Sequence, residues 1–234
     1  MIKAVLFDLD GTLLPMDQDR FVAKYLKELV RKLMPYGYDP EKLMHGIYQG
    51  IAAMYANDGS RNNEEAFWDA FTGIFGADSR KDEPLFLDFY NNEFHNAKTE
   101  CGFATDVSAL ISLIREKELR VILATNPLFP AVATRNRIRW AGLQPEDFEL
   151  VTTFENSHYC KPNPAYYQEI LGKMNLVPEE CVMVGNDVTE DMVARELGMD
   201  VFLLTDCLIN KELKDIQQYP NGGFPELITW IRGL

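Results

Sequence analysis

The residues most able to do chemistry are polar side chains that follow short apolar segments or lie in a proline-stiffened loop. In order along the chain they are Asp8 and Asp10, Thr125 and Asn126, Lys161, Asn186 and Asp187. They supply carboxylates, a hydroxyl, amides and one ammonium group, which is the combination that phosphoryl transfer uses. Any one of these signals is weak, because strand ends commonly carry Asp, Asn and Gly simply to turn. Their occurrence in this order indicates a phosphoryl-transfer site.

The closely spaced pair Asp8 and Asp10, in VLFDLDGT, can divide the chemistry between two carboxylates. We expect Asp8 to attack phosphorus and form an aspartyl phosphate, an established form of covalent catalysis. We expect Asp10 to protonate the leaving oxygen and later to deprotonate water, a role that needs a raised pKa. Gly11 gives the backbone the freedom to turn beneath them.

Metal and phosphate ligands follow from the same set. Mg²⁺ accepts few protein ligands and prefers oxygen, so Asp8 and Asp187 are its expected carboxylate ligands. Lys161 and the Thr125 hydroxyl are expected to bind the phosphoryl oxygens, and Asn126 is assigned to phosphate binding with them. Asp191 can return to the same place from the following turn.

The elements that must bring these residues together are buried parallel strands. Four segments are almost wholly apolar and so suit strands that are covered on both faces: 4–7, 120–125, 181–185 and 201–205, with 149–154 as a weaker candidate. Helical patterns separate them at 105–117, with Thr105 as the expected N-cap, at 163–174 and at 189–199. The alternation predicts an α/β domain with a parallel sheet and helices on both faces, whose strands end at one edge.

Residues 16–97 interrupt that alternation. Apolar residues recur there at helical spacing over 19–34, 41–55, 64–75 and 85–94, and Asp39-Pro40 has the form of an N-cap followed by a first-turn proline. No strand pattern occurs in this span, which predicts an inserted all-α unit.

Composition limits the partners. The 234 residues are 47% hydrophobic, enough for a substantial core, and the net charge of −13 argues against nucleic acid and anionic membranes. The four cysteines have no spacing typical of zinc sites or disulfide frameworks (Cys101, Cys160, Cys181, Cys207). The chain shows neither a signal-peptide pattern nor a stretch of membrane-spanning length, so we expect a cytoplasmic protein.

These segments resemble the motifs of the haloacid dehalogenase-like hydrolases: FDLDGTL (7–13), ATN (124–126), CKPNP (160–164) and VGNDVTEDM (184–192). The resemblance implies a Rossmann-like catalytic core of residues 1–15 and 98–234, with 16–97 as an α-helical cap. It also implies that Asp8 is the nucleophile and Asp10 the acid/base, that the Asp10 backbone carbonyl binds Mg²⁺, and that Thr125 and Lys161 bind the phosphoryl group.

The fourth motif departs from the pattern of many relatives, in which the glycine is followed at once by aspartate. Alignment by Gly185 puts Asn186 at the metal position, and alignment by the spacing to Asp191 puts Asp187 there. We favour Asp187, because a divalent cation gains more from a full negative charge than from an amide oxygen. Asp191 is then a secondary or water-mediated ligand, and Glu190 is interpreted as facing solvent.

The presence of Asp10 favours phosphate chemistry, because the dehalogenases of this superfamily lack an acid at that position and do not need Mg²⁺. We therefore expect a Mg²⁺-dependent phosphatase that hydrolyses a small phosphorylated metabolite. A phosphomutase acting on a sugar phosphate uses the same aspartyl phosphate and stays an alternative. A non-catalytic phosphoacceptor module, like a receiver domain, is a more distant one. The substrate and the oligomeric state are left open by the sequence.

Overall fold

A single parallel sheet forms the centre of the computed structural model, which describes residues 1–102 and 106–234. The strand order is β3-β2-β1-β4-β5-β6, and every neighbouring pair is parallel. In the described residues the strands are β1 Ala4–Phe7, β2 Arg120–Leu123, β3 Leu150–Val151, β4 Cys181–Gly185, β5 Asp200–Leu204 and β6 Asn221–Gly222. The predicted α/β class and parallel sheet are confirmed.

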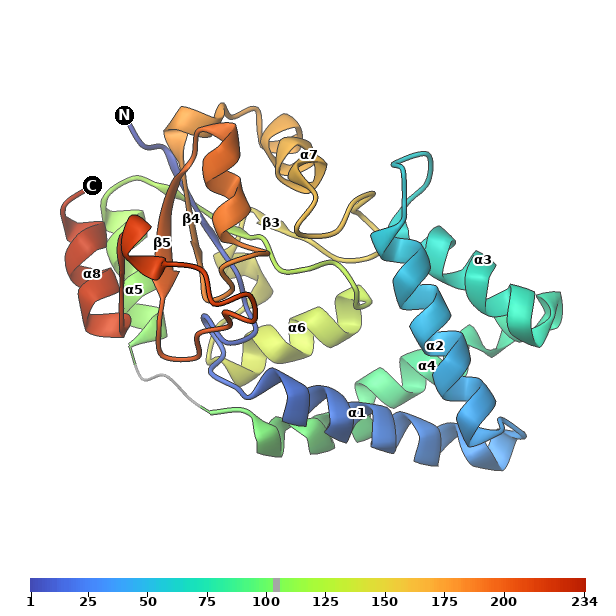
Figure 1. Cartoon of the computed structure of the whole chain (residues 1–234). Coiled ribbons are helices and arrows are strands. Elements are labelled where there is room, and N and C mark those ends of the chain that lie inside the picture. The colour runs from blue at the N-terminus through green and yellow to red at the C-terminus, as the bar shows by residue number, and fades with distance from the viewer. Residues whose placement is uncertain (103–105) are drawn as a thin grey trace.

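Both faces of the sheet are covered, as the apolar strands require. In β1, Ala4 and Leu6 belong to one hydrophobic cluster with helix α7 (Pro164–Met174), whereas Val5 and Phe7 belong to another with α5 (Val107–Glu116) and α8 (Phe224–Arg232). Successive strand residues point to opposite faces, so an all-apolar strand indicates cover on both sides. Figure 1 shows α7 on the opposite side of the sheet from α5 and α8.

The other helices of the described residues are α1 Gln18–Leu33, α2 Pro40–Tyr55, α3 Asn63–Phe75, α4 Glu83–Asn91 and α6 Ala131–Trp140. Asp39 caps α2 as expected, because its side chain accepts a hydrogen bond from the Lys42 amide. The expected N-cap Thr105 lies outside the described residues. Helices α6 and α8 were not expected from the sequence.

The α-helix expected over 189–199 is wrong. A 3-10 helix spans Met192–Leu197, and the residues before it form a turn. The reason is local: the Asp187 carboxylate accepts hydrogen bonds from the amides of Thr189 and Glu190, and this holds the backbone in the turn.

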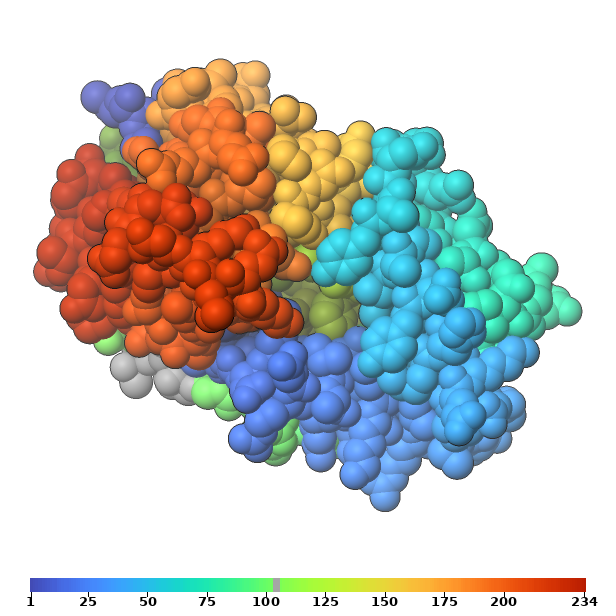
Figure 2. Space-filling model, viewed as in Figure 1, coloured from blue at the N-terminus to red at the C-terminus, as the bar shows by residue number. Residues whose placement is uncertain are grey.

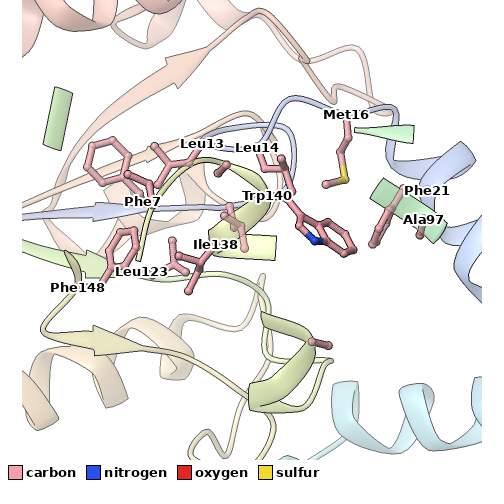
Figure 3. Close-up of a cluster of buried hydrophobic side chains, with 14 of the residues drawn as sticks. Phe7, Leu13, Leu14, Met16, Phe21, Ala97, Leu123, Ile138, Trp140 and Phe148 are labelled. Atoms are coloured by element: carbon pink, nitrogen blue, oxygen red, sulfur yellow. The ribbon is translucent and has the colours of Figure 1, made fainter. Parts of the chain in front are cut away.

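Residues 16–97 contain α1 to α4, which lie together on one side of the sheet (Figure 1). Their packing is continuous with that of the sheet, because Trp140 of α6 stacks on Phe94 at 5.1 Å between ring centroids and also contacts Phe21 of α1. Figure 3 shows Trp140 between the β1 region and Phe21. The division into a core of 1–15 and 98–234 and a cap of 16–97 stays a prediction.

The chain passes twice between the sheet and the helical segment 16–97, and the two connecting segments lie side by side. Gly102 donates its amide hydrogen to the Pro15 carbonyl at 2.7 Å, and Met16 and Cys101 form an isolated antiparallel bridge. Within the described residues, no helix combines the length and the apolar character that crossing a membrane requires.

Candidate active site

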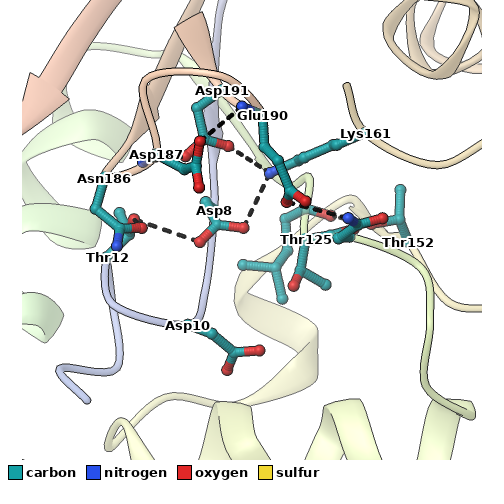
Figure 4. A network of polar contacts seen from close by, with 12 residues as sticks. Asp8, Asp10, Thr12, Thr125, Thr152, Lys161, Asn186, Asp187, Glu190 and Asp191 are labelled. Carbon is teal, nitrogen blue, oxygen red and sulfur yellow. Dashed lines mark hydrogen bonds and ion pairs between the residues drawn. The ribbon is translucent and has the colours of Figure 1, made fainter. Parts of the chain in front are cut away.

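A buried lysine joins two of the predicted site residues. Lys161 Nζ lies 2.9 Å from Asp8 Oδ1 and 2.6 Å from Asp191 Oδ1 (Figure 4). Lys161 is 0% exposed and Asp191 is 1% exposed. Burial alone would lower the pKa of Lys161, but the Asp191 and Asp8 carboxylates outweigh it and hold that pKa well above its usual range. Lys161 is therefore a fixed positive charge beside Asp8.

The Thr12 hydroxyl links Asp8 to Asn186 on the other side. It lies 3.4 Å from Asp8 Oδ2 and 3.0 Å from Asn186 Oδ1, and the Asn186 amide nitrogen donates to the Cys207 carbonyl at 2.7 Å. Gly11 makes this approach feasible: its φ is +87°, and a Cβ there would lie 2.3 Å from Asn186 Nδ2.

Asp187 is engaged differently. Its Oδ1 accepts from the amides of Thr189 at 2.7 Å and Glu190 at 2.8 Å, and its own amide donates to Asp191 Oδ2 at 3.0 Å. The contacts of the described residues therefore tie Asn186 to Asp8 through Thr12, whereas they tie Asp187 to its own turn. The sequence-based choice of Asp187 over Asn186 stays a prediction.

Residues 125 and 126 also lie at this edge of the sheet, after β2. Figure 4 places Thr125 on the same side of the network as Lys161. The Thr125 carbonyl accepts hydrogen bonds from the hydroxyls of Thr152 at 2.7 Å and Tyr166 at 2.9 Å, and these hold the segment in place. Asn126 Nδ2 donates to Glu190 Oε2 at 3.0 Å.

The solvent-facing interpretation of Glu190 is wrong. Its carboxylate contacts Asn126 and accepts a hydrogen bond from the Tyr55 hydroxyl of α2 at 3.4 Å. Burial raises the pKa of Glu190 to about 7. This residue connects the site with the helical segment 16–97, an arrangement that its position after Asp187 in the sequence did not reveal.

Asp10 lies apart from the Asp8 network. In Figure 4 its carboxylate points away from Asp8. Its partner is Arg137 of α6, whose Nη1 donates to Asp10 Oδ2. Burial raises the pKa of Asp10 to about 6, although the Arg137 charge acts in the opposite direction. That direction agrees with the expectation for an acid/base carboxyl.

Arg137 was missed because α6 was not recognised. The helix carries an available signal: Arg137 shares one face with Ala133 and Ala141, four residues before and after it, and both are buried. A charged side chain on the buried face of a helix requires a counter-charge nearby.

The donor set fits a hard divalent cation. Three largely buried carboxylates (Asp8, Asp10, Asp191) share only two paired cations (Lys161, Arg137) among the described residues, so the negative groups outnumber the positive ones by one. Within 1–102 and 106–234 no group of three His, Cys, Asp or Glu residues could hold a metal by itself. Mg²⁺ does not require such a group, because it is bound by one or two carboxylates and keeps several waters.

A cavity of about 700 Å³ opens beside Asp10 and Asn186. Its walls come from the start of α1, including Asp17 and Arg20, and from residues 206–211. Figure 2 shows the hollow between the blue start of α1 and the red 206–211 segment. Its volume is in the range of small-molecule sites.

The fold and this arrangement agree with a family model for haloacid dehalogenase-like hydrolases, which matches residues 2–198. The chain belongs to this family. Among solved structures, a 2-haloacid dehalogenase from Pseudomonas syringae pv. Tomato DC3000 shares the fold with a TM-score of 0.64 and 19% identity, covering 100% of this chain and 99% of that one.

Two curated relatives are phosphatases by name. A glyceraldehyde 3-phosphate phosphatase from Methanothermobacter thermautotrophicus is 26% identical over 221 residues, covering 93% of this chain and 92% of the relative. A phosphoglycolate phosphatase from Colwellia psychrerythraea is 24% identical over 207 residues, covering 87% of this chain and 84% of the relative.

Proposed function

We propose that the protein is a Mg²⁺-dependent phosphatase that hydrolyses a small phosphorylated metabolite through an aspartyl phosphate on Asp8. The observation that carries the proposal is the setting of Asp8, whose carboxylate lies between the Lys161 ammonium and the Thr12 hydroxyl at the end of β1. The names of the two phosphatase relatives support it, and the presence of Asp10 disfavours dehalogenation.

The proposed reaction has two steps, and each side chain has a defined part in them. An Asp8 carboxylate oxygen forms a bond to phosphorus while the bond from phosphorus to the leaving oxygen breaks, and Asp10 gives that oxygen its proton. In the second step water attacks the phosphorus of the aspartyl phosphate and Asp10 takes a proton from that water, while the bond from phosphorus to the Asp8 oxygen breaks and free phosphate leaves. Lys161 and Thr125 bind the phosphoryl oxygens throughout.

Mg²⁺ would be held by the Asp8 carboxylate, the Asp10 backbone carbonyl and a side-chain oxygen of Asn186 or Asp187. When bound, it neutralises phosphoryl charge. The residues of the chain bind the substrate, orient it and move protons.

Release of inorganic phosphate tests the proposal. The protein is incubated with Mg²⁺ and a panel of phosphate esters that contains glyceraldehyde 3-phosphate, phosphoglycolate, sugar 1-phosphates and p-nitrophenyl phosphate. We expect release from at least one ester and its loss when EDTA removes the metal. Conversion of a sugar 1-phosphate to the 6-phosphate without release would support a phosphomutase instead. A stable phosphoprotein without turnover would support the phosphoacceptor alternative.

A further inference from the structure

Each of the two closely spaced aspartates has its own buried cation. Asp8 lies 2.9 Å from Lys161 Nζ, and Asp10 is bonded to Arg137 Nη1. The two carboxylates point in different directions although only Leu9 separates them in the chain (Figure 4). Lys161 contacts Asp8 and Asp191 but not Asp10. The direction of the Asp10 side chain therefore requires a separate explanation.

Arg137 is fixed by its surroundings. It is 0% exposed, its guanidinium carbon lies 4.2 Å from the centre of the Phe129 ring, and Nη2 donates to Thr134 Oγ1 at 3.3 Å. An arginine side chain stays charged in proteins, and a buried charge without a partner is strongly unfavourable. Asp10 therefore cannot turn away from Arg137 without leaving that charge uncompensated.

The pairing also distinguishes the two oxygens of Asp10. Oδ2 accepts from Arg137, whereas Oδ1 is buried and has no hydrogen-bond partner in the part of the chain that the structure describes. Asp10 lines the cavity described above, together with Asn186. Oδ2 is thus occupied by Arg137, whereas Oδ1 is the carboxylate oxygen whose hydrogen-bonding capacity is unfilled among the described residues.

We propose that Arg137 is the positioning residue for Asp10, a proposal that rests on the proposed function. Arg137 holds Oδ2, so that Oδ1 gives its proton to the leaving oxygen as the phosphorus–oxygen bond breaks and takes a proton from the attacking water afterwards. It also keeps the Asp10 carboxylate away from Lys161, which is left to Asp8 and the phosphoryl group.

The test compares leaving groups in Arg137→Lys and Arg137→Met. The phenolate of p-nitrophenyl phosphate leaves without much help from an acid, whereas an alkoxide requires protonation. In both variants we expect kcat/KM to fall for the best alkyl phosphate of the panel and to fall less for p-nitrophenyl phosphate. The two losses should differ by a factor of about ten or more. If Arg137→Met does not fold, Arg137→Lys, which keeps the buried charge, carries the test.

Two controls separate positioning from a structural role. Arg139→Met changes an exposed arginine two residues further along α6. It should leave kcat/KM unchanged for both the alkyl phosphate and p-nitrophenyl phosphate. In an Asp10→Asn background, Arg137→Lys should have no further effect on the ratio of alkyl to aryl kcat/KM. The proposal would be overturned if Arg137→Lys lowered kcat/KM equally for alkyl and aryl esters. It would also be overturned if this substitution changed the ratio in the Asp10→Asn background as much as in the unsubstituted protein. Absence of phosphate release by the unsubstituted protein from every ester would instead overturn the proposed function.

Discussion

At the scale of single residues, each of the two closely spaced carboxylates has a different cation beside it. Asp8 shares Lys161 with Asp191, and Asp10 is paired with Arg137. An opposite charge favours the ionised carboxylate, whereas burial favours the protonated one, so neighbouring aspartates can differ in behaviour. The sequence was sufficient to select Asp8 and Asp10, which follow an apolar segment, and Lys161, which lies in a proline-stiffened loop, as candidates. It did not reveal the pairing of Asp10 with Arg137, which lies 127 residues away.

The metal ligand after β4 belongs to this scale, and here the contacts favour Asn186 over Asp187, which the sequence alone favoured. Because Asn186 Oδ1 shares the Thr12 hydroxyl with Asp8, we expect Asn186→Ala to weaken Mg²⁺ binding about tenfold or more. We expect a smaller effect from Asp187→Asn, whose amide oxygen can still accept from the turn. Calorimetric titration with Mg²⁺ measures both, with circular dichroism to confirm folding. Loss of binding in Asp187→Asn alone would favour the sequence-based choice.

At the scale of elements, the positions of the loops matter as much as the strands. Helix α7 anchors the loop that carries Lys161, because Glu169 accepts from the His158 amide at 2.9 Å and contacts its ring nitrogen at 2.7 Å. Lys173 reaches the same carboxylate at 2.8 Å. The sequence predicted α7 and the apolar strands, whose pattern is strong. It gave no indication of β6, which is only Asn221–Gly222, and α6 was not recognised because three arginines obscure its helical pattern.

We expect Glu169 to make the stability of the fold depend on pH. Burial raises its pKa, but hydrogen bonds from Lys173 and His158 outweigh this and lower the pKa below its ordinary value of 4.5. A lowered folded-state pKa stabilises the fold above pH 4.5, and that stabilisation is lost as the pH falls through the folded value. We expect Glu169→Gln to cost about 1 kcal/mol at pH 7 and progressively less in acid.

Urea unfolding at several pH values measures this difference. Glu116→Gln, on the exposed face of α5, is the matched control and should follow the unsubstituted protein throughout. A constant difference between Glu169→Gln and the unsubstituted protein from neutral to acid pH would show that the Glu169 charge is not responsible.

At the scale of the whole molecule, the helical segment 16–97 and the loops that follow the strands are joined by a buried asparagine. Asn63, at the start of α3, is 0% exposed and donates to the Tyr159 carbonyl and to Cys160 Sγ, each at 3.3 Å. The backbone amide of Asn63 donates to the Ser157 carbonyl at 2.8 Å. Helical spacing was enough to predict the inserted helices. Their docking depends on contacts between residues nearly a hundred positions apart, which no local pattern records.

We expect Asn63→Ala to lower the free energy of unfolding by about 1–3 kcal/mol, because buried partners lose their donor. Hydrogen exchange should become faster in α2 and α3 while that of the central strands changes less. Asn91→Ala is the matched control, since its exposed side-chain amide donates to the Leu87 carbonyl within α4. Unchanged exchange in Asn63→Ala would mean that this contact does not hold the helical segment in place.

Attack by Asp8 on phosphorus is the central claim, and the phosphorylated protein tests it most directly. The protein is mixed with Mg²⁺ and a ³²P-labelled ester that it turns over, quenched with acid within milliseconds and separated from free substrate. We predict label on the protein, mapped to the peptide that contains Asp8, and neither label nor turnover in a folded Asp8→Asn variant. Rapid turnover by Asp8→Asn, or label on another residue, would contradict the claim.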